Sequence, residues 1–177
     1  MPTISSNIAR INESILEAAA ISNFPEKVTL VAVSKGHSFD KIIEAFDAGI
    51  INFGENYLQE ALNKKLHLEN FAIQWHFLGP IQSNKCRLIA ENFDWVHSVD
   101  RLKVAQRLSS LRSEDRQPLN VTLQINLQNG LMTRQVGHQR KDENTLLVPK
   151  AFAYDRKNKG LYTYGIFGPQ EKFGYLQ

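Results

Sequence analysis

Disulfide bonds and long apolar stretches are both missing from this sequence of 177 residues. Its single cysteine, Cys86, cannot form a disulfide within the chain, and we expect it to be a packed or surface thiol rather than a reactive one. No stretch of the sequence approaches the roughly 18 consecutive apolar residues that a membrane-spanning helix needs. Residues 1–7 also lack the basic start and the apolar centre of a signal peptide. We therefore expect a cytoplasmic protein that does not enter the membrane.

Metal-binding and glycine-rich phosphate-binding motifs are missing as well. The cysteine and the histidines do not stand at the spacings typical of metal sites, and Gly79-Pro80 is better explained as a turn after a strand. With 42% hydrophobic residues the chain can bury one core, and its length suits one domain. A complete barrel of eight βα units usually has about 250 residues, so this chain is short for one.

Apolar, strand-like runs recur at a fixed interval in the first two thirds of the chain. They begin near Val28, Ile50, Ala72 and Asp94, each 22 residues after the one before, and a fifth strand is predicted at 119–126. The apolar residues between these runs have helical spacing. Such alternation favours an α/β fold in which right-handed crossovers connect parallel strands, either in an open sheet or in a barrel. The predicted helices cover residues 8–16, 39–46, 57–68, 85–92 and 101–112.

Lys35 is the first candidate for chemistry. It follows the apolar run 28–34, whose β-branched residues suit a strand covered on both faces, and it precedes Gly36. In a parallel barrel the carboxyl ends of the strands form the active face. A partly desolvated lysine there can lose its proton and form a Schiff base with a carbonyl compound. The alternative is that Lys35 merely ends a strand by reaching water.

Other polar residues stand at the neighbouring strand ends. If the strands are parallel, Asn56, His76 and Asn126 would lie near Lys35 at the carboxyl end of the sheet or barrel. Two structural alternatives stay open at this point. Asn56 would then be only a helix cap after a tight turn, and His76 a hydrogen-bonded core histidine.

Four motifs in this order resemble those of the pyridoxal phosphate homeostasis proteins. They are residues 31–35 (VAVSK), 53–57 (FGENY), 75–85 (WHFLGPIQSNK) and 98–101 (SVDR). The resemblance implies a (β/α) TIM-barrel-like fold similar to the N-terminal barrel of bacterial alanine racemase, with pyridoxal 5'-phosphate bound to Lys35. Asn56 matches the family's asparagine beside the cofactor, and His76 matches a histidine near its ring. The glutamate and tyrosine that flank Asn56 are expected to order the second loop.

The resemblance implies a function in binding rather than catalysis. We expect a pyridoxal phosphate protein for cofactor homeostasis or delivery, with PLP-dependent apoenzymes as transient partners, and its oligomeric state is left open. One alternative is a racemase-like enzyme, which would also need a placed acid or base. Another is a module that binds nucleic acid or an acidic partner through a basic tail.

The resemblance ends near Leu127. Residues 1–127 are predicted to be the N-terminal part of a PLP-binding barrel, incomplete at about five βα units, and residues 128–177 a divergent, largely irregular tail. The charge changes there, from 13 Lys and Arg against 14 Asp and Glu before the boundary to 8 against 4 after it. A frameshift, a gene fragment or a natural replacement of the second half would each explain the break. No residue here matches the family's phosphate-holding positions, which lie in later strands.

Overall fold

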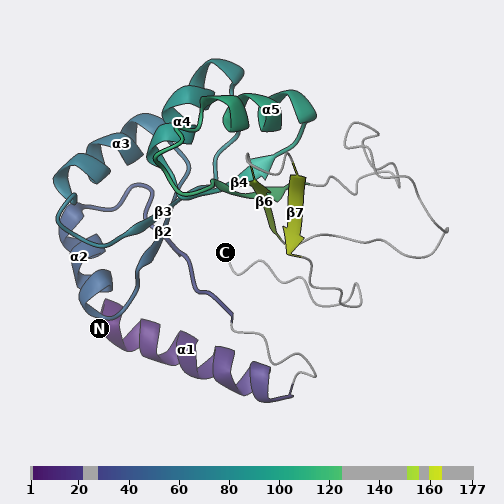
Figure 1. Cartoon of the computed structure of the whole chain (residues 1–177). Helices are drawn as coiled ribbons and strands as arrows, with labels where there is room; N and C mark the ends of the chain where they lie inside the picture. The colour runs from purple at the N-terminus through teal and green to yellow at the C-terminus, as the bar shows by residue number, and fades with distance from the viewer. Residues whose placement is uncertain (1, 22–27, 125–150, 156–159, 165–177) are drawn as a thin grey trace. The chain divides into compact units, whose positions relative to one another are not determined.

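The computed structural model describes residues 2–21, 28–124, 151–155 and 160–164 (Figure 1). The chain divides into two compact units, Met1–Gly79 and Pro80–Gln177. No helix in these described ranges is long and apolar enough to cross a membrane. The prediction for Asn126 falls outside the described residues.

The first unit alternates helices with parallel strands, as the 22-residue interval predicted. Strand β2 pairs with β1 on one side and with β3 on the other, both in parallel. Val33 lies opposite Gly54, and Gly54 lies opposite His76, so these residues form one row across the three strands. Helices α2 and α3 lie on one side of the strands (Figure 1). The elements are α1 (Ile4–Ile21), β1 (Ala32–Val33), α2 (Phe39–Asp47), β2 (Asn52–Glu55), α3 (Leu58–His67) and β3 (Gln74–Phe77).

The first strand is shorter than the apolar run 28–34 predicted. Only Ala32 and Val33 are in strand conformation, and Val28 is 58% exposed. Among the described residues β1 pairs with β2 alone within this unit. The run has the composition of a strand between two neighbours, but here only one neighbour supplies hydrogen bonds. Apolar composition alone therefore overestimated the length of the strand.

The second unit contains both parallel and antiparallel pairs. Strand β4 pairs with β5 in parallel, with a register shift between Val96 and Val99, whereas β5 pairs with β6 and β6 with β7 in antiparallel fashion. The last two strands lie in the segment that was predicted to be largely irregular, and β7 includes its apolar piece 161–164. The elements are η1 (Ser83–Lys85), α4 (Cys86–Asn92), β4 (Trp95–Val99), α5 (Leu102–Leu111), β5 (Asn120–Leu123), β6 (Ala151–Asp155) and β7 (Gly160–Tyr164).

Apolar residues at helical and strand spacing form the core of the second unit. Ile89 on α4, Val96 on β4 and Val104 on α5 are completely buried. Cys86, at the start of α4, is also completely buried, and this burial raises the pKa of its thiol. Both observations agree with the prediction of a packed, unreactive cysteine.

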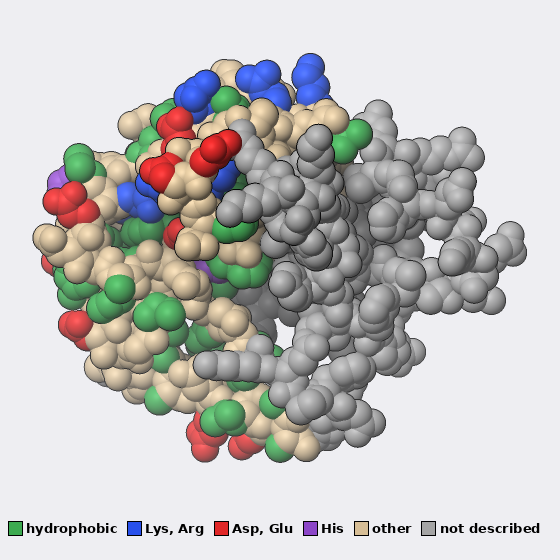
Figure 2. Space-filling view, in the orientation of Figure 1, with side chains coloured by type: hydrophobic (Ala, Val, Ile, Leu, Met, Phe, Trp, Pro, Cys, Tyr) green, Lys and Arg blue, Asp and Glu red, His purple; other side chains and the backbone are tan. Residues whose placement is uncertain are grey.

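Charged side chains of both signs lie on the surface of the molecule. In Figure 2, Lys and Arg side chains gather at the top of the view, with Asp and Glu side chains close by. On helix α4, Arg87 and Glu91 form an exposed pair whose side chains are 3.4 Å apart. Mixed charge of this kind is typical of a solvated helix surface.

Arg112 joins α4, α5 and the chain between them. Its guanidinium is buried and donates hydrogen bonds to the carbonyl oxygens of Ala90, Phe93 (2.8 Å) and Gln117 (2.9 Å). The first two carbonyls lie where α4 ends and the chain turns toward β4. Because all three acceptors lie on the backbone, Arg112 fixes the path of the chain between these elements.

We predict that Arg112→Met lowers the free energy of unfolding by about 2 to 4 kcal/mol, because it leaves carbonyl groups in the interior without their charged donor. Urea unfolding followed by circular dichroism measures this loss. Arg116→Met is the matched control, since Arg116 is exposed. Equal stability of the two variants would contradict this role for Arg112.

Candidate functional site

A tight turn follows strand β1 and carries Lys35. The amide of Ser34 donates to the carbonyl of Gly54 (3.0 Å), which continues the pairing with β2, and the amide of His37 donates back to the carbonyl of Ser34 (3.0 Å). Gly36 has a φ of +72°, as the third residue of a type II turn requires. Lys35 is the second residue of this turn and is exposed. The turn thus presents the lysine to solvent at the carboxyl end of the strand.

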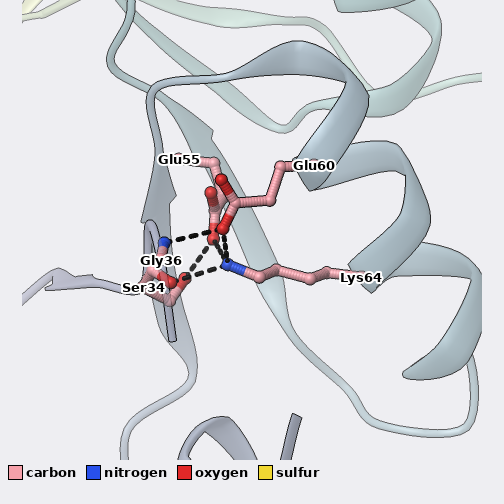
Figure 3. A network of polar contacts seen from close by, with 5 residues as sticks. All are labelled: Ser34, Gly36, Glu55, Glu60 and Lys64. Carbon is pink, nitrogen blue, oxygen red and sulfur yellow. Dashed lines mark hydrogen bonds and ion pairs between the residues drawn. The ribbon is translucent and has the colours of Figure 1, made fainter. Parts of the chain in front are cut away.

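A network of polar contacts holds this turn from the side of helix α3 (Figure 3). The ammonium of Lys64 donates to the carbonyl of Ser34 (2.6 Å), to Oε1 of Glu55 (2.7 Å) and to Oε1 of Glu60 (2.6 Å). The Ser34 hydroxyl also donates to Oε1 of Glu55 (2.6 Å), and the Gly36 amide donates to Oε1 of Glu60 (2.7 Å). Contacts from α3 therefore reach the residues on both sides of Lys35.

Burial makes the centre of this network strong. Lys64 is 3% exposed and Glu55 is completely buried, so water screens their ion pair little. Each of the three protons of the Lys64 ammonium has an acceptor, whereas Oε2 of Glu55 has no hydrogen-bond partner in the part of the chain that the structure describes. Removing one member of a buried pair leaves the other as an uncompensated charge. The fold of this corner therefore depends on both residues.

The network was not predicted from the sequence. Glu55 was expected to order the second loop, and Lys64 was not singled out at all. The one available signal was the spacing of Glu60 and Lys64, four residues apart on a predicted helix, which allows an ion pair between them. That spacing does not reveal the contacts with Ser34 and Gly36 on another element.

Asn56 directly follows strand β2, next to Glu55 of the network. The register pairs Val33 with Gly54, and the pairing ends with the Ser34 amide, one residue before Lys35 enters the turn. The side-chain oxygen of Asn56 is buried and has no hydrogen-bond partner among the described residues. Tyr57, not Asn56, is the N-cap residue of α3, so the helix-cap explanation of Asn56 is wrong. A role for Asn56 at the cofactor stays a prediction.

Gly79 fixes the backbone at this point. A Cβ atom at residue 79 would collide with the carbonyl oxygen of Asn56, so the two chain segments pack directly against each other. The amide of Leu78 donates to the carbonyl of Glu55 (2.8 Å), which continues the pairing of β3 with β2. The position of Asn56 is thus set by β3 as well as by β2.

His76 lies within the paired part of the sheet rather than after a strand end. It is opposite Gly54 of β2. It is 3% exposed, and its Nε2 lies 3.0 Å from Oδ1 of Asn52. These contacts agree with the interpretation of His76 as a hydrogen-bonded core histidine. A role for His76 at the cofactor stays a prediction.

The described residues contain no cluster of three or more His, Cys, Asp or Glu side chains that could hold a metal ion. The turn itself presents the exposed amine of Lys35. An amine of this kind can bond covalently to an aldehyde.

Comparison with known proteins gives a family match over most of the chain. The sequence model of the family described as alanine racemase, N-terminal domain, matches residues 6–165. The match thus continues beyond residue 127, where the motifs predicted that the resemblance ends, and a domain boundary at 127 stays a prediction. The parallel strands and this match confirm the predicted barrel-like α/β fold class.

Curated relatives named pyridoxal phosphate homeostasis protein are similar to this chain. The protein of Pseudomonas aeruginosa is 56% identical over 128 residues, which are 72% of this chain and 56% of that protein. The protein of Escherichia coli K12 is 47% identical over 131 residues, with the same two coverages. The resemblance inferred from the four motifs is thereby confirmed. The chain spans about half the length of these curated relatives.

Solved structures of PipY from Synechococcus elongatus PCC7942 are also similar. The structure without PLP has a TM-score of 0.61 at 38% identity and covers 71% of this chain and 54% of PipY. The structure with PLP bound has a TM-score of 0.54 at 40% identity and covers 62% and 48%. PipY therefore resembles this chain in sequence as well as in fold.

We predict that Lys64→Met lowers the free energy of unfolding by about 3 to 5 kcal/mol, because it leaves the Glu55 carboxylate buried without its cation. Urea unfolding measures the change. Lys41→Met on α2 is the matched control, because Lys41 is exposed. A loss in Lys64→Met no greater than that of the control would contradict the strength assigned to this ion pair.

The network also predicts a pH dependence of stability. The hydrogen bond from Lys64 and then that from the Gly36 amide lower the pKa of Glu60, with smaller contributions from the charges of Lys64 and His37. The folded state therefore favours the ionised carboxylate, which stabilises the fold at neutral pH. This stabilisation is lost as the pH falls through the lowered pKa.

The stability difference between the wild type and Glu60→Gln should accordingly be larger at pH 7 than at pH 3, below the ordinary carboxyl pKa of about 4. Urea unfolding at both pH values measures it. A difference that does not shrink in acid would show that the charge of Glu60 contributes nothing to the fold.

Proposed function

The chain belongs to the alanine racemase N-terminal domain family, and on that premise we propose that it binds pyridoxal 5'-phosphate for cofactor homeostasis or delivery. Relatives at 56% and 47% identity bear the name pyridoxal phosphate homeostasis protein, and PipY has been solved with PLP bound. Transfer to PLP-dependent apoenzymes, as transient partners, is part of this proposal. So is the absence of catalytic turnover.

The observation that carries the proposal is the turn of residues 34–37, which carries Lys35. Lys35 is exposed at the corner of a turn that is fixed from both sides, and Asn56 follows the neighbouring strand with a side-chain oxygen that has no hydrogen-bond partner among the described residues. Bound PLP supplies an aldehyde carbon that a lysine amine can attack. We assign the covalent contact to Nζ of Lys35 and a polar contact to Asn56, with His76 as a supporting residue of the same sheet.

A second lysine close by does not compete for the aldehyde. Lys64 is buried, and its ammonium protons are all taken by acceptors. Because its amine is buried, the aldehyde of PLP does not reach Nζ of Lys64 in the folded protein. Reaction with PLP should therefore select Lys35 over Lys64.

Borohydride reduction after addition of PLP tests this assignment. We expect peptide mass spectrometry to find the reduced cofactor mainly on Lys35, because this lysine combines exposure with a fixed backbone. In Lys35→Ala the label should be lost, whereas Lys41→Ala, an exposed lysine on α2, should retain it. Labelling scattered over exposed lysines in a folded protein would contradict the proposal.

Lys35→Ala should leave the fold nearly unchanged, with a loss of stability below about 0.5 kcal/mol. The reason is that an exposed side chain at a turn corner contributes little to packing. Circular dichroism and urea unfolding of the variant provide the measurement. A large loss of folded signal would mean that Lys35 serves the fold rather than the cofactor.

Turnover is tested on the same samples by following the optical rotation of an amino acid in the presence of PLP. We expect no loss of rotation beyond that of PLP alone. Racemisation that disappears in Lys35→Ala would make the chain an enzyme and overturn the homeostasis assignment.

A further inference from the structure

We propose that Glu60 and Lys64 are positioning residues for Lys35, and that their contacts with the turn set how readily this lysine binds PLP. The inference rests on the proposed function, because it concerns the same lysine. It assigns a task to two residues of α3 that lie outside the strand ends. Neither residue needs to touch the cofactor for this role.

The first step of the argument is that the contacts bracket Lys35. Lys64 binds the carbonyl of residue 34 at 2.6 Å, and Glu60 binds the amide of residue 36 at 2.7 Å. Both peptide groups adjoining Lys35 are therefore tied to one helix (Figure 3). The backbone of Lys35 is held in place while its exposed side chain stays accessible.

The second step is that the two contacts form one unit. Nζ of Lys64 lies 2.6 Å from the same Glu60 oxygen that accepts from Gly36, one helical turn away on α3. Glu55, at the end of β2, joins the pair through its Oε1. A disturbance at Glu60 therefore reaches the turn directly through Gly36 and indirectly through Lys64.

The third step concerns the cost of capturing a ligand. A lysine on a mobile turn must lose conformational freedom when its amine becomes bonded, whereas a fixed turn has lost that freedom during folding. The buried ion pair of Lys64 and Glu55 holds α3 against the strand end. The hydrogen bond between Glu60 and the Gly36 amide then restrains the turn itself. Preorganisation of this kind favours binding without a direct contact to the ligand.

Glu60 is the better residue to vary. Its side chain is 32% exposed against 4% for Lys64, so its replacement leaves the buried ion pair in place. Glu60→Ala removes both contacts, and Glu60→Asp keeps a carboxylate but is one methylene too short for the same reach. Glu60→Gln retains an oxygen acceptor at the same position and should rescue part of the effect.

A matched control lies on helix α4. Glu91 forms an exposed pair with Arg87 at the same four-residue spacing, at 3.4 Å, and this pair lies in the other unit. Glu91→Ala removes an acidic side chain and an ion pair without touching the lysine turn. It should bind PLP as the wild type does.

The experiment combines PLP titration with amide hydrogen exchange. We expect Glu60→Ala and Glu60→Asp to bind PLP about tenfold more weakly, because the freed turn must then become ordered when PLP binds, with Glu60→Gln in between. Without PLP, exchange at the Gly36 amide should accelerate in Glu60→Ala, while the strands of the unit keep their protection. That local change separates positioning from general destabilisation.

Two outcomes would overturn the inference: wild-type affinity in Glu60→Ala and Glu60→Asp, or an unchanged exchange rate at Gly36. Wild-type protein that PLP does not label at Lys35 would instead refute the proposed function. The exchange rate at Gly36 then decides alone whether Glu60 holds the turn. Failure of the site and failure of its positioning are therefore distinguishable.

Discussion

The ammonium of Lys64 is the interaction on which the site depends. It binds the end of β1 through the Ser34 carbonyl, the end of β2 through Glu55 and its own helix through Glu60. A cation in the interior is stable only with such partners, so the ion pair fixes the distance between α3 and two strand ends. The turn that carries Lys35 takes its shape from this restraint and from Gly36, whose φ of +72° suits no other residue as well.

Parallel pairing supplies the second constraint. Because β1, β2 and β3 run in the same direction, their carboxyl ends lie at one edge, where Lys35 follows β1 and Asn56 follows β2. His76 lies within β3, where its Nε2 is 3.0 Å from Oδ1 of Asn52. Topology therefore decides which polar residues follow the strand ends, and the side-chain contacts decide which polar residues serve the sheet itself.

Much of this was predictable from the sequence. Periodicity gave α3, α4 and α5 to within a few residues, but it marked only the middle of α1, and the 22-residue interval gave the parallel strands. The short β1 was missed because apolar composition does not show how many neighbours a strand has. The network was missed because Glu55 was expected only to order its own loop, and because the sequence does not show that Lys64 is buried. A spacing of four residues links Glu60 with Lys64, but no pattern within one helix indicates a contact with the turn before it.

All five residues of the network lie between positions 34 and 64, inside the first unit. The restraint on Lys35 is therefore local and needs no residue of the second unit. Recognition of a phosphate group is a separate requirement, since it calls for several donors that oppose a dianion. Capture of an aldehyde and selection of a phosphorylated aldehyde are thus physically separable tasks. The residues that hold the turn of Lys35 come from one strand end, one turn and one helix, so the restraint on this lysine does not depend on the part of the relatives that this chain does not match.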